Sequence, residues 1–312
     1  MTQNSLKIYI AGHTGFVGTA LVRHFSKNSG VEILTARHSE LDLTRQTEVE
    51  SFLAKEKPDI VINASGKVGG IHTNAAYPAD FIYQNLMMEA NLIHASFKAG
   101  VKKLLHFGSA CIYPKICAQP MSPELLMTGK IESTNEPYAI AKLAGLSMRE
   151  ATNRQYGTSY ITAIPSNLYG PGDTFDLERA HVVSSLMRKF HEAKENKVPT
   201  VTLWGSGLVK RDFLFVDDMA EACEILLERY KGEAPVNIGS GGSTSVKELA
   251  GVIANVVGFE GESEWDRSKP DGAPERFLDT SFMVNKLNWI PKMDLKEGLK
   301  KTIAWRISKC AS

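Results

Sequence analysis

Short apolar runs alternate with longer segments of helical periodicity over the first half of the chain. Strands are predicted in five runs rich in apolar residues: Lys7–Ala11, Val31–Thr35, Ile60–Ala64, Lys103–Phe107 and Tyr160–Pro165. Helices are predicted between and beside them, over residues 17–26, 48–55, 85–99 and 138–156. This alternation predicts an α/β fold with a Rossmann-type, doubly wound parallel sheet.

The pattern changes after about residue 170. Further elements are predicted there: a helix over 181–194, strands over 200–204, 211–216 and 236–238, and a helix over 217–230. Helices and Pro/Gly-rich loops fill the remainder, without a repeat or a low-complexity linker. We therefore predict a Rossmann domain over residues 1–170 and a smaller, interleaved domain over 171–312, with the segment from about 211 to 238 returning to the first domain.

Composition narrows the class of protein. The chain has 312 residues, and its 36 Lys and Arg against 35 Asp and Glu give a net charge of +1, which argues against a nucleic-acid or membrane-surface partner. No apolar run approaches the roughly 20 residues of a membrane-spanning helix. The polar start, Met1–Lys7, carries no secretory signal pattern. We expect a cytoplasmic enzyme.

The cysteines and histidines show neither a disulfide framework nor a metal-binding spacing. Four cysteines in a chain of this length are too few for a disulfide-rich scaffold: Cys111, Cys117, Cys223 and Cys310. No CxxC or HExxH spacing occurs, so no metal is expected.

A glycine-rich loop follows the first predicted strand and opens the first helix. Gly12, Gly15 and Gly18 flank His13-Thr14 and Phe16-Val17. Glycines in this context let the backbone approach a pyrophosphate, whose charge the helix N-terminus attracts. We predict that residues 12–18, including Thr14, Phe16 and Val17, bind a dinucleotide.

The end of the second predicted strand indicates which dinucleotide. An NAD site usually places an acidic residue there, to bind the ribose hydroxyls. This chain has Arg37 instead, which suits the 2′-phosphate of NADPH or NADP, although it could also be a solvated loop charge. Further cofactor contacts are predicted at four positions near strand ends: Asp42, Ala64, Ser65 and Asn167.

The pair Tyr138 and Lys142 indicates the chemistry. Four positions apart on a predicted helix, the two side chains share one face. An ammonium beside a phenol lowers the tyrosine pKa, so that Tyr138 can exchange a proton with a sugar oxygen while hydride moves to or from nicotinamide. Ser109, just after the fourth strand, could hydrogen-bond the same oxygen.

Two further residues are candidate proton carriers. Cys111 lies two positions beyond Ser109, on the same side if the segment is extended. It could be an acid or base, or simply a small buried hydrophobe. His181, at the start of a predicted helix, could donate a proton across a cleft or lie unused at the surface.

Cations of the second domain could bind a substrate diphosphate. Lys189, Arg211 and Lys269 are the candidates, although most such residues are solvated surface charges. Arg211 stands out because it follows Trp204 and a glycine-flanked loop and precedes an apolar run. Trp204 is included in the predicted substrate site.

Several longer strings resemble a known family. The glycine loop, Ser109 and the Tyr138/Lys142 pair are similar to those of the extended short-chain dehydrogenase/reductase family of nucleotide-sugar enzymes. More specific strings resemble its GDP-L-fucose synthases, from Lys7 to the C-terminus: Lys67–Ile71, Tyr77–Asn85, Cys111–Lys115, Asn135–Lys142, Asn167–Pro171, His181 and Ser268–Gly272.

The resemblance implies an activity and roles. These enzymes convert GDP-4-keto-6-deoxy-D-mannose to GDP-L-fucose, by epimerising C3 and C5 and then reducing C4 with NADPH. It implies Cys111 as the base and His181 as the acid on the opposite face, with His181 also near the cofactor. Ser109, Tyr138 and Lys142 would form the reductive triad. A homodimer through the helices at 85–99 and 138–156 is also implied.

Two departures from the family pattern and three rival functions remain. Thr14 stands where the family often has an arginine, so NADPH preference depends more on Arg37, and Lys189 replaces a diphosphate-binding arginine. The nearest rival is a related GDP-4-keto-sugar enzyme of the colitose or heptose type. The others are an NAD-retaining 4-epimerase or 4,6-dehydratase, which Arg37 disfavours, and a non-catalytic dinucleotide sensor, which the retained triad disfavours.

Overall fold

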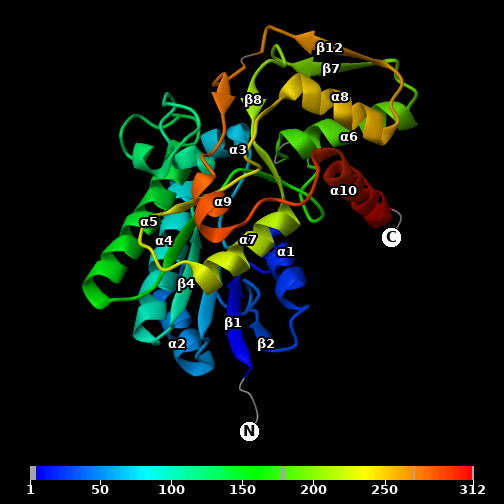
Figure 1. The fold of residues 1–312 in the computed structure, drawn as a ribbon. Coiled ribbons are helices and arrows are strands. Elements are labelled where there is room, and N and C mark those ends of the chain that lie inside the picture. Colours follow the sequence, from blue (N-terminus) through cyan, green and yellow to red (C-terminus); the bar gives the residue numbers. More distant parts are fainter. Residues whose placement is uncertain (1–4, 177–179, 270, 311–312) are drawn as a thin grey trace.

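Six parallel strands form the central sheet, in the order β10-β5-β4-β3-β1-β2 (Figure 1). The computed structural model describes residues 5–176, 180–269 and 271–310. The strands of the sheet are β1 (Leu6–Ala11), β2 (Val31–Leu34), β3 (Ile60–Asn63), β4 (Lys103–Phe107), β5 (Ile161–Pro165) and β10 (Val236–Ile238). The predicted Rossmann-type α/β sheet is confirmed.

The strand order reverses at β1, and this reversal positions the ligand site. The chain passes from β1 to β2 on one side and then to β3 on the other side of β1. In doubly wound sheets, ligands bind where the order reverses, outside the carboxyl ends of the strands. Gly12 directly follows β1 at this point.

Helices cover both faces of the sheet. One face packs against α1 (Phe16–Phe25), α7 (Val216–Arg229) and α9 (Ser281–Leu287); the other packs against α2 (Gln46–Glu56), α4 (Pro78–Lys98) and α5 (Glu136–Tyr156). Alternate residues of β1 face opposite layers, with Ile8 and Ile10 toward α1 and Tyr9 toward α2. Strands buried on both faces explain the continuous apolar runs of the sequence.

A second lobe lies over the carboxyl ends of the strands (Figure 1). Its core joins α6 (Val182–Glu195), α8 (Val246–Val257) and α10 (Leu295–Cys310) with β7 (Thr200–Trp204), which pairs with β12 (Glu262–Asp266). Shorter elements connect the lobes: β6 (Asn167–Tyr169) with β9 (Phe213–Phe215), and β8 (Lys210–Arg211) between β11 (Thr244–Ser245) and β13 (Glu275–Arg276). The chain leaves this lobe through α7 and β10 and rejoins the large sheet; the domain bounds themselves remain a prediction.

Three short elements complete the described chain. Most predicted bounds differ from the observed ones by one or two residues, and two predicted elements differ more. The three are α3 (Ile71–Ala76) and the 3-10 turns η1 (Ala110–Ile112) and η2 (Pro123–Leu125). Helix α4 begins at Pro78, seven residues before the predicted start, because proline is well suited to the first turn. The strand predicted over 211–216 is broken at Asp212, whose buried carboxylate accepts hydrogen bonds from the backbone and hydroxyl of Ser240.

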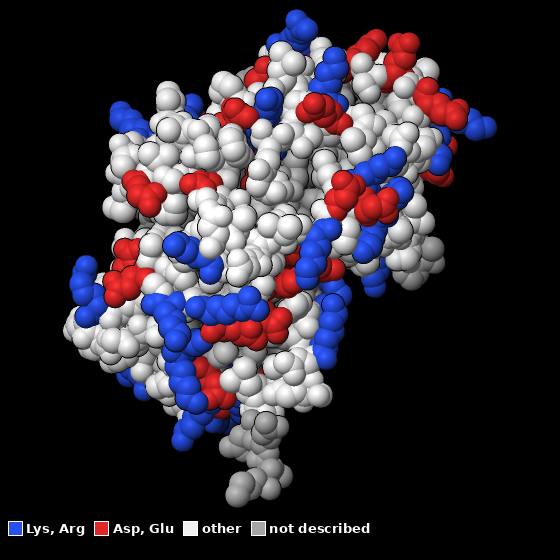
Figure 2. Space-filling view, in the orientation of Figure 1, with Lys and Arg blue, Asp and Glu red and all other residues white. Residues whose placement is uncertain are grey.

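The surface carries interspersed charges of both signs on the face shown in Figure 2. Of the helices in the described part of the chain, none combines the length and hydrophobicity that crossing a membrane would require.

A substitution at Gly18 tests how closely α1 packs against the glycine loop. A Cβ at Gly18 would overlap the carbonyl oxygen of Gly12, which is backbone and cannot rotate away. We expect Gly18→Ala to lower the free energy of unfolding by about 1–3 kcal/mol, as overpacking does. Chemical denaturation measures this.

Gly251 supplies the matched control. It lies inside α8, is exposed, and a Cβ there would meet no atom within 4 Å. Gly251→Ala should raise the free energy of unfolding by about 1 kcal/mol, because alanine is the better helix former. Equal effects of the two substitutions would contradict the packing argument.

Candidate active site

The glycine loop forms a cradle that side chains would fill. Gly12 has a φ of 76°, and a Cβ there would lie 2.6 Å from the carbonyl oxygen of Ala64. Gly15 is the N-cap of α1 and carries no side-chain cap, and the first turn of the helix has no acidic residue. The first N–H groups of α1 therefore face the loop without a side-chain acceptor, which suits a pyrophosphate.

Neighbouring groups also fit a dinucleotide. Thr14 is exposed beside the cradle, whereas Phe16 and Val17 are half-buried and pack against the core beneath it. Two buried polar atoms here, Nδ1 of His13 and Nδ2 of Asn63, have no hydrogen-bond partner within the described residues. A ligand with polar groups could satisfy them.

Residues after β2 and β3 border the same edge of the sheet. Ala64 donates its N–H to the Ala11 carbonyl (3.0 Å), and the Ser65 hydroxyl donates to Oδ1 of Asn63 (2.5 Å). Arg37 is exposed, and no hydrogen bond or ion pair of its guanidinium is found in the described structure. Asp42 is half-buried, and its carboxylate accepts two hydrogen bonds from Thr44, which lower its pKa.

Tyr138, Lys142, Ser109 and Cys111 meet above β4. Helix α5 carries Tyr138 and Lys142 one turn apart, with Lys142 Nζ 5.9 Å from the centre of the Tyr138 ring. Residues 110–112 form the 3-10 turn η1, so the extended geometry considered for Cys111 does not occur. Its thiol still points to Ser109, because Sγ donates to the Ser109 hydroxyl at 3.1 Å.

The pKa of the Tyr138 phenol is higher than predicted. Burial raises its pKa to about 12, although the Lys142 ammonium and a hydrogen bond with Ser109 act in the opposite direction. The negative charges of Cys111 and Glu89 raise it further. The predicted lowering of this pKa is therefore wrong for the protein alone, and Tyr138 is a proton donor over the ordinary pH range.

The Cys111 thiol is tuned by opposing effects. Burial raises its pKa, whereas the Ser109 hydrogen bond and the charges of Arg276 and Lys142 lower it. Arg276 lies on β13, and its Nη2 donates to the Ala110 carbonyl at 2.9 Å. A residue of the second lobe thus holds the turn that carries the thiol.

Lys142 has a carboxylate partner that sequence reasoning missed. Its Nζ lies 2.6 Å from Oε1 of Glu89, and both side chains are almost fully buried. The sequence feature that could have revealed Glu89 is a charged residue on the buried face of α4, at helical spacing from Phe81, Asn85 and Leu92. Arg276, also missed, had no such signal, because only the pairing of β13 with β8 brings it near Cys111.

His181 makes no direct polar contact with these groups in the described structure. It is the exposed N-cap of α6, one residue before the helix starts, and no hydrogen bond or ion pair joins it to Cys111 among the described residues. Its charge lowers the pKa of Asp173, which burial raises overall. Asn167, at the start of β6, donates Nδ2 to the Asp212 carbonyl (2.9 Å).

The second lobe gathers the predicted substrate-binding residues. Lys189 and Lys269 each place Nζ 5.5 Å from the Trp204 ring, which is 59% exposed. Arg211 donates to the Ala273 carbonyl (2.9 Å) and is in register with Arg276. Burial lowers the pKa of both Lys189 and Arg211. Lys189 and Lys269, which are distant in sequence, thus lie over the same Trp204 ring.

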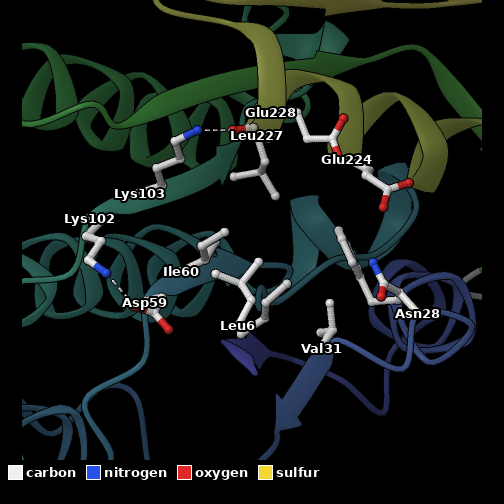
Figure 3. A pocket seen from close by; sticks show the side chains of 12 residues that line it. Leu6, Asn28, Val31, Asp59, Ile60, Lys102, Lys103, Glu224, Leu227 and Glu228 are labelled. Atoms are coloured by element: carbon white, nitrogen blue, oxygen red, sulfur yellow. Dashed lines mark hydrogen bonds and ion pairs between the residues drawn. The ribbon is translucent and has the colours of Figure 1, made fainter. Parts of the chain in front are cut away.

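A cavity of about 250 Å³ lies elsewhere (Figure 3). Its lining includes the first residues of four strands: Leu6, Val31, Ile60 and Lys103. It therefore opens at the amino ends of the sheet, opposite the glycine loop, and is not part of this site.

Known proteins are similar to this chain over most or nearly all of its length. The sequence model of the NAD dependent epimerase/dehydratase family matches residues 8–239. GDP-L-fucose synthase 1 of Arabidopsis thaliana is 50% identical over 98% of this chain and 94% of its own length. GDP-L-colitose synthase of Yersinia pseudotuberculosis is 34% identical over 97% and 99%.

A solved structure is also similar to this chain over nearly its full length. MlghC, a GDP-mannoheptose C4 reductase from Campylobacter jejuni with NADP bound, has a TM-score of 0.89 at 37% identity, covering 98% of this chain and 99% of that one. The chain therefore belongs to the NAD dependent epimerase/dehydratase family, as a relative of the GDP-L-fucose synthases.

Proposed function

We propose that this enzyme converts GDP-4-keto-6-deoxy-D-mannose to GDP-L-fucose, inverting C3 and C5 and reducing C4 with NADPH. The observation that carries the proposal is the thiol of Cys111 hydrogen-bonded to Ser109, beside the protonated Tyr138. This arrangement supports two reactions in one site: proton exchange at carbons next to a ketone, and proton donation to the ketone oxygen.

The reduction uses Tyr138 as acid. Bound NADPH supplies the hydride for C4. Tyr138 gives its proton to the C4 oxygen, and Ser109 hydrogen-bonds the same oxygen. The raised pKa of Tyr138 supports this direction of transfer, because a group must carry a proton in order to donate it.

The epimerisations use Cys111 and His181. Protons at C3 and C5 are acidic because the C4 ketone stabilises the resulting enolate, and hydrogen bonds from Ser109 and Tyr138 to that oxygen stabilise it further. Cys111 removes each proton as a thiolate. Burial raises the pKa of this thiol overall, and the charges of Arg276 and Lys142 act against that rise. His181 returns a proton on the opposite face, once substrate bridges the two lobes.

Substrate and cofactor are held at separate edges of the site. Lys189, Lys269, Arg211 and Trp204 would bind the GDP portion through its diphosphate. The glycine cradle would bind the cofactor pyrophosphate, with Arg37 on the 2′-phosphate. Asp42, Ala64, Ser65 and Asn167 would contact the remainder of the NADPH.

Exposed apolar side chains on α4 and α5 support a homodimer. Tyr83, Leu86 and Ile140 are 60%, 38% and 43% exposed, on the two helices implied by the family resemblance. A monomeric mass in solution would contradict this. The three described cysteines are unpaired, which fits a cytoplasmic enzyme, and cell fractionation tests that location.

Rivals of the 4-epimerase and 4,6-dehydratase type retain NAD, whose ribose an acidic residue near the end of the second strand usually binds. This chain has the cation of Arg37 there, which disfavours both. Colitose-type and heptose-type enzymes share the reductive chemistry, so the product distinguishes them.

The first test is the complete reaction. Purified enzyme with GDP-4-keto-6-deoxy-D-mannose and NADPH should oxidise the cofactor and form GDP-L-fucose, identified by NMR. Tyr138→Phe should lower the rate by about 10²- to 10⁴-fold, the usual contribution of a general acid. Unchanged activity in Tyr138→Phe would refute its role.

The second test separates epimerisation from reduction. Cys111→Ala should oxidise NADPH slowly and yield an unepimerised 6-deoxy sugar, because the reductive residues remain. Cys117→Ala is the matched control, since Cys117 is a half-buried free cysteine with no hydrogen bond to the proposed acids among the described residues. GDP-L-fucose formed by Cys111→Ala at the normal rate would remove the thiol from the mechanism.

The third test concerns Arg37. Arg37→Ala should lower the preference for NADPH over NADH by about tenfold to a hundredfold, because a hydrogen bond to a charged group contributes about 1.5–3 kcal/mol. The ratio of kcat/KM for the two cofactors measures this. Arg154→Ala, an exposed arginine on α5, should leave the ratio unchanged. A preserved ratio in Arg37→Ala would show that the phosphate is bound elsewhere.

A further inference from the structure

A chain of buried polar groups ends at Lys142. Arg149 Nε donates to the Thr162 hydroxyl at 3.1 Å, and this hydroxyl lies 3.3 Å from Nδ1 of His106. Nε2 of His106 lies 2.9 Å from Oε2 of Glu89, whose Oε1 lies 2.6 Å from Lys142 Nζ. All five residues are buried. The chain links α5, β5, β4 and α4 directly below the reactive tyrosine.

The donors and acceptors of this chain fix its protons. Arginine has only donors, so the Thr162 oxygen accepts from Arg149 and its own hydrogen goes to Nδ1 of His106. His106 then carries its proton on Nε2 and donates it to Glu89. Burial lowers the pKa of His106, which is therefore neutral.

Glu89 is ionised in this setting. Burial raises the pKa of its carboxyl, but the charge of Lys142 and the contacts of His106 outweigh burial and bring it below the ordinary value. With His106 neutral, Glu89 is the anion that balances Lys142. A buried ion pair of this kind requires both partners, because a lone buried charge is very costly.

Helix α5 is shaped to admit the carboxylate. Gly145 lies inside α5, where glycine is among the least favourable residues. A Cβ there would overlap Oε2 of Glu89 and lie 2.8 Å from Nε2 of His106. The absence of a side chain at Gly145 creates the space in which the Glu89–His106 pair lies.

The Lys142 ammonium interacts with Glu89 and also with the proposed reactive groups Tyr138 and Cys111. Glu89 from α4 lies on one side, with His106 from β4 behind it. Tyr138 on α5 and Cys111 on η1 lie on the other. An ammonium whose charge is balanced by Glu89 lowers the pKa of Tyr138 less than an unpaired ammonium would.

We propose that Glu89 is a positioning residue for proton transfer: anchored by His106, its carboxylate fixes the Lys142 ammonium beside the Tyr138 ring and keeps the phenol in its proton-donating form. The proposal rests on the proposed reduction, in which Tyr138 acts as acid. Glu89 acts through Lys142 and does not touch the substrate.

Glu89→Gln tests this proposal, because it removes the charge and retains the size. Removing a negative charge favours proton loss from both Lys142 and Tyr138, so the first alkaline pKa of the site should fall by about one unit or more. Tyrosinate absorbance, measured against the Tyr138→Phe version of each protein, isolates Tyr138. The Glu89→Gln protein should show tyrosinate at a pH at which wild type still shows none.

The pH dependence of kcat should shift in the same direction as the Tyr138 titration. The alkaline limb of the kcat profile should shift to lower pH in Glu89→Gln, with KM for the GDP-sugar unchanged. Glu50→Gln is the matched control, because Glu50 also pairs with a lysine, at 2.7 Å from Lys98, but at the surface. It should leave both profiles unchanged.

Glu89→Asp keeps the test decisive if Glu89→Gln does not fold. Aspartate retains the charge but is one methylene shorter, so it cannot reach both His106 and Lys142. We expect an alkaline shift smaller than that of glutamine. Wild-type profiles in every folded Glu89 variant would overturn the proposal.

The titration also separates this proposal from the proposed function, because it needs no substrate. A wild type that makes no GDP-L-fucose, with a shifted Tyr138 titration in Glu89→Gln, would refute the function and preserve the coupling. Fucose formation with an unshifted titration would do the reverse.

Discussion

The buried charge of Lys142 is the constraint on which the site depends. An ammonium beneath the reactive tyrosine must be balanced, because an uncompensated charge in the protein interior is strongly destabilising. Glu89 balances it, and His106 and the gap at Gly145 hold that carboxylate in place. Helices α4 and α5 and strand β4 are therefore constrained together, and the protonation of Tyr138 follows from their packing.

The second lobe faces the carboxyl ends of the strands. The glycine cradle, Ser109 and the Tyr138 helix belong to the sheet layer, whereas the second lobe carries Lys189 and Lys269 beside Trp204, the cations proposed to bind a diphosphate. Arg276 connects the two, because it pairs beside Arg211 and also donates to the turn of Cys111. The small sheet β11-β8-β13 therefore places Arg211, proposed to bind substrate, in register with Arg276, which contacts the turn of Cys111.

Local patterns predicted the sheet and the glycine loop after β1, whereas tertiary contacts determine how the side chains around Tyr138 meet. Strand β4 and the glycine loop follow from apolar runs and glycine spacing, which are properties of neighbouring residues. The shift of the Tyr138 pKa was predicted in the wrong direction, because burial, together with the negative charges of Cys111 and Glu89, outweighs the adjacent Lys142. Arg276 could not be predicted, since it reaches Cys111 only through the pairing of β13 with β8.

The most direct test of the account is the reaction in heavy water with ordinary NADPH. If Cys111 and His181 exchange protons at C3 and C5 and hydride arrives at C4, the GDP-L-fucose formed should carry deuterium at C3 and C5 and protium at C4. NMR of the product reads all three positions at once. Deuterium at C4, or protium retained at C3 and C5, would contradict a single site that combines enolisation with reduction.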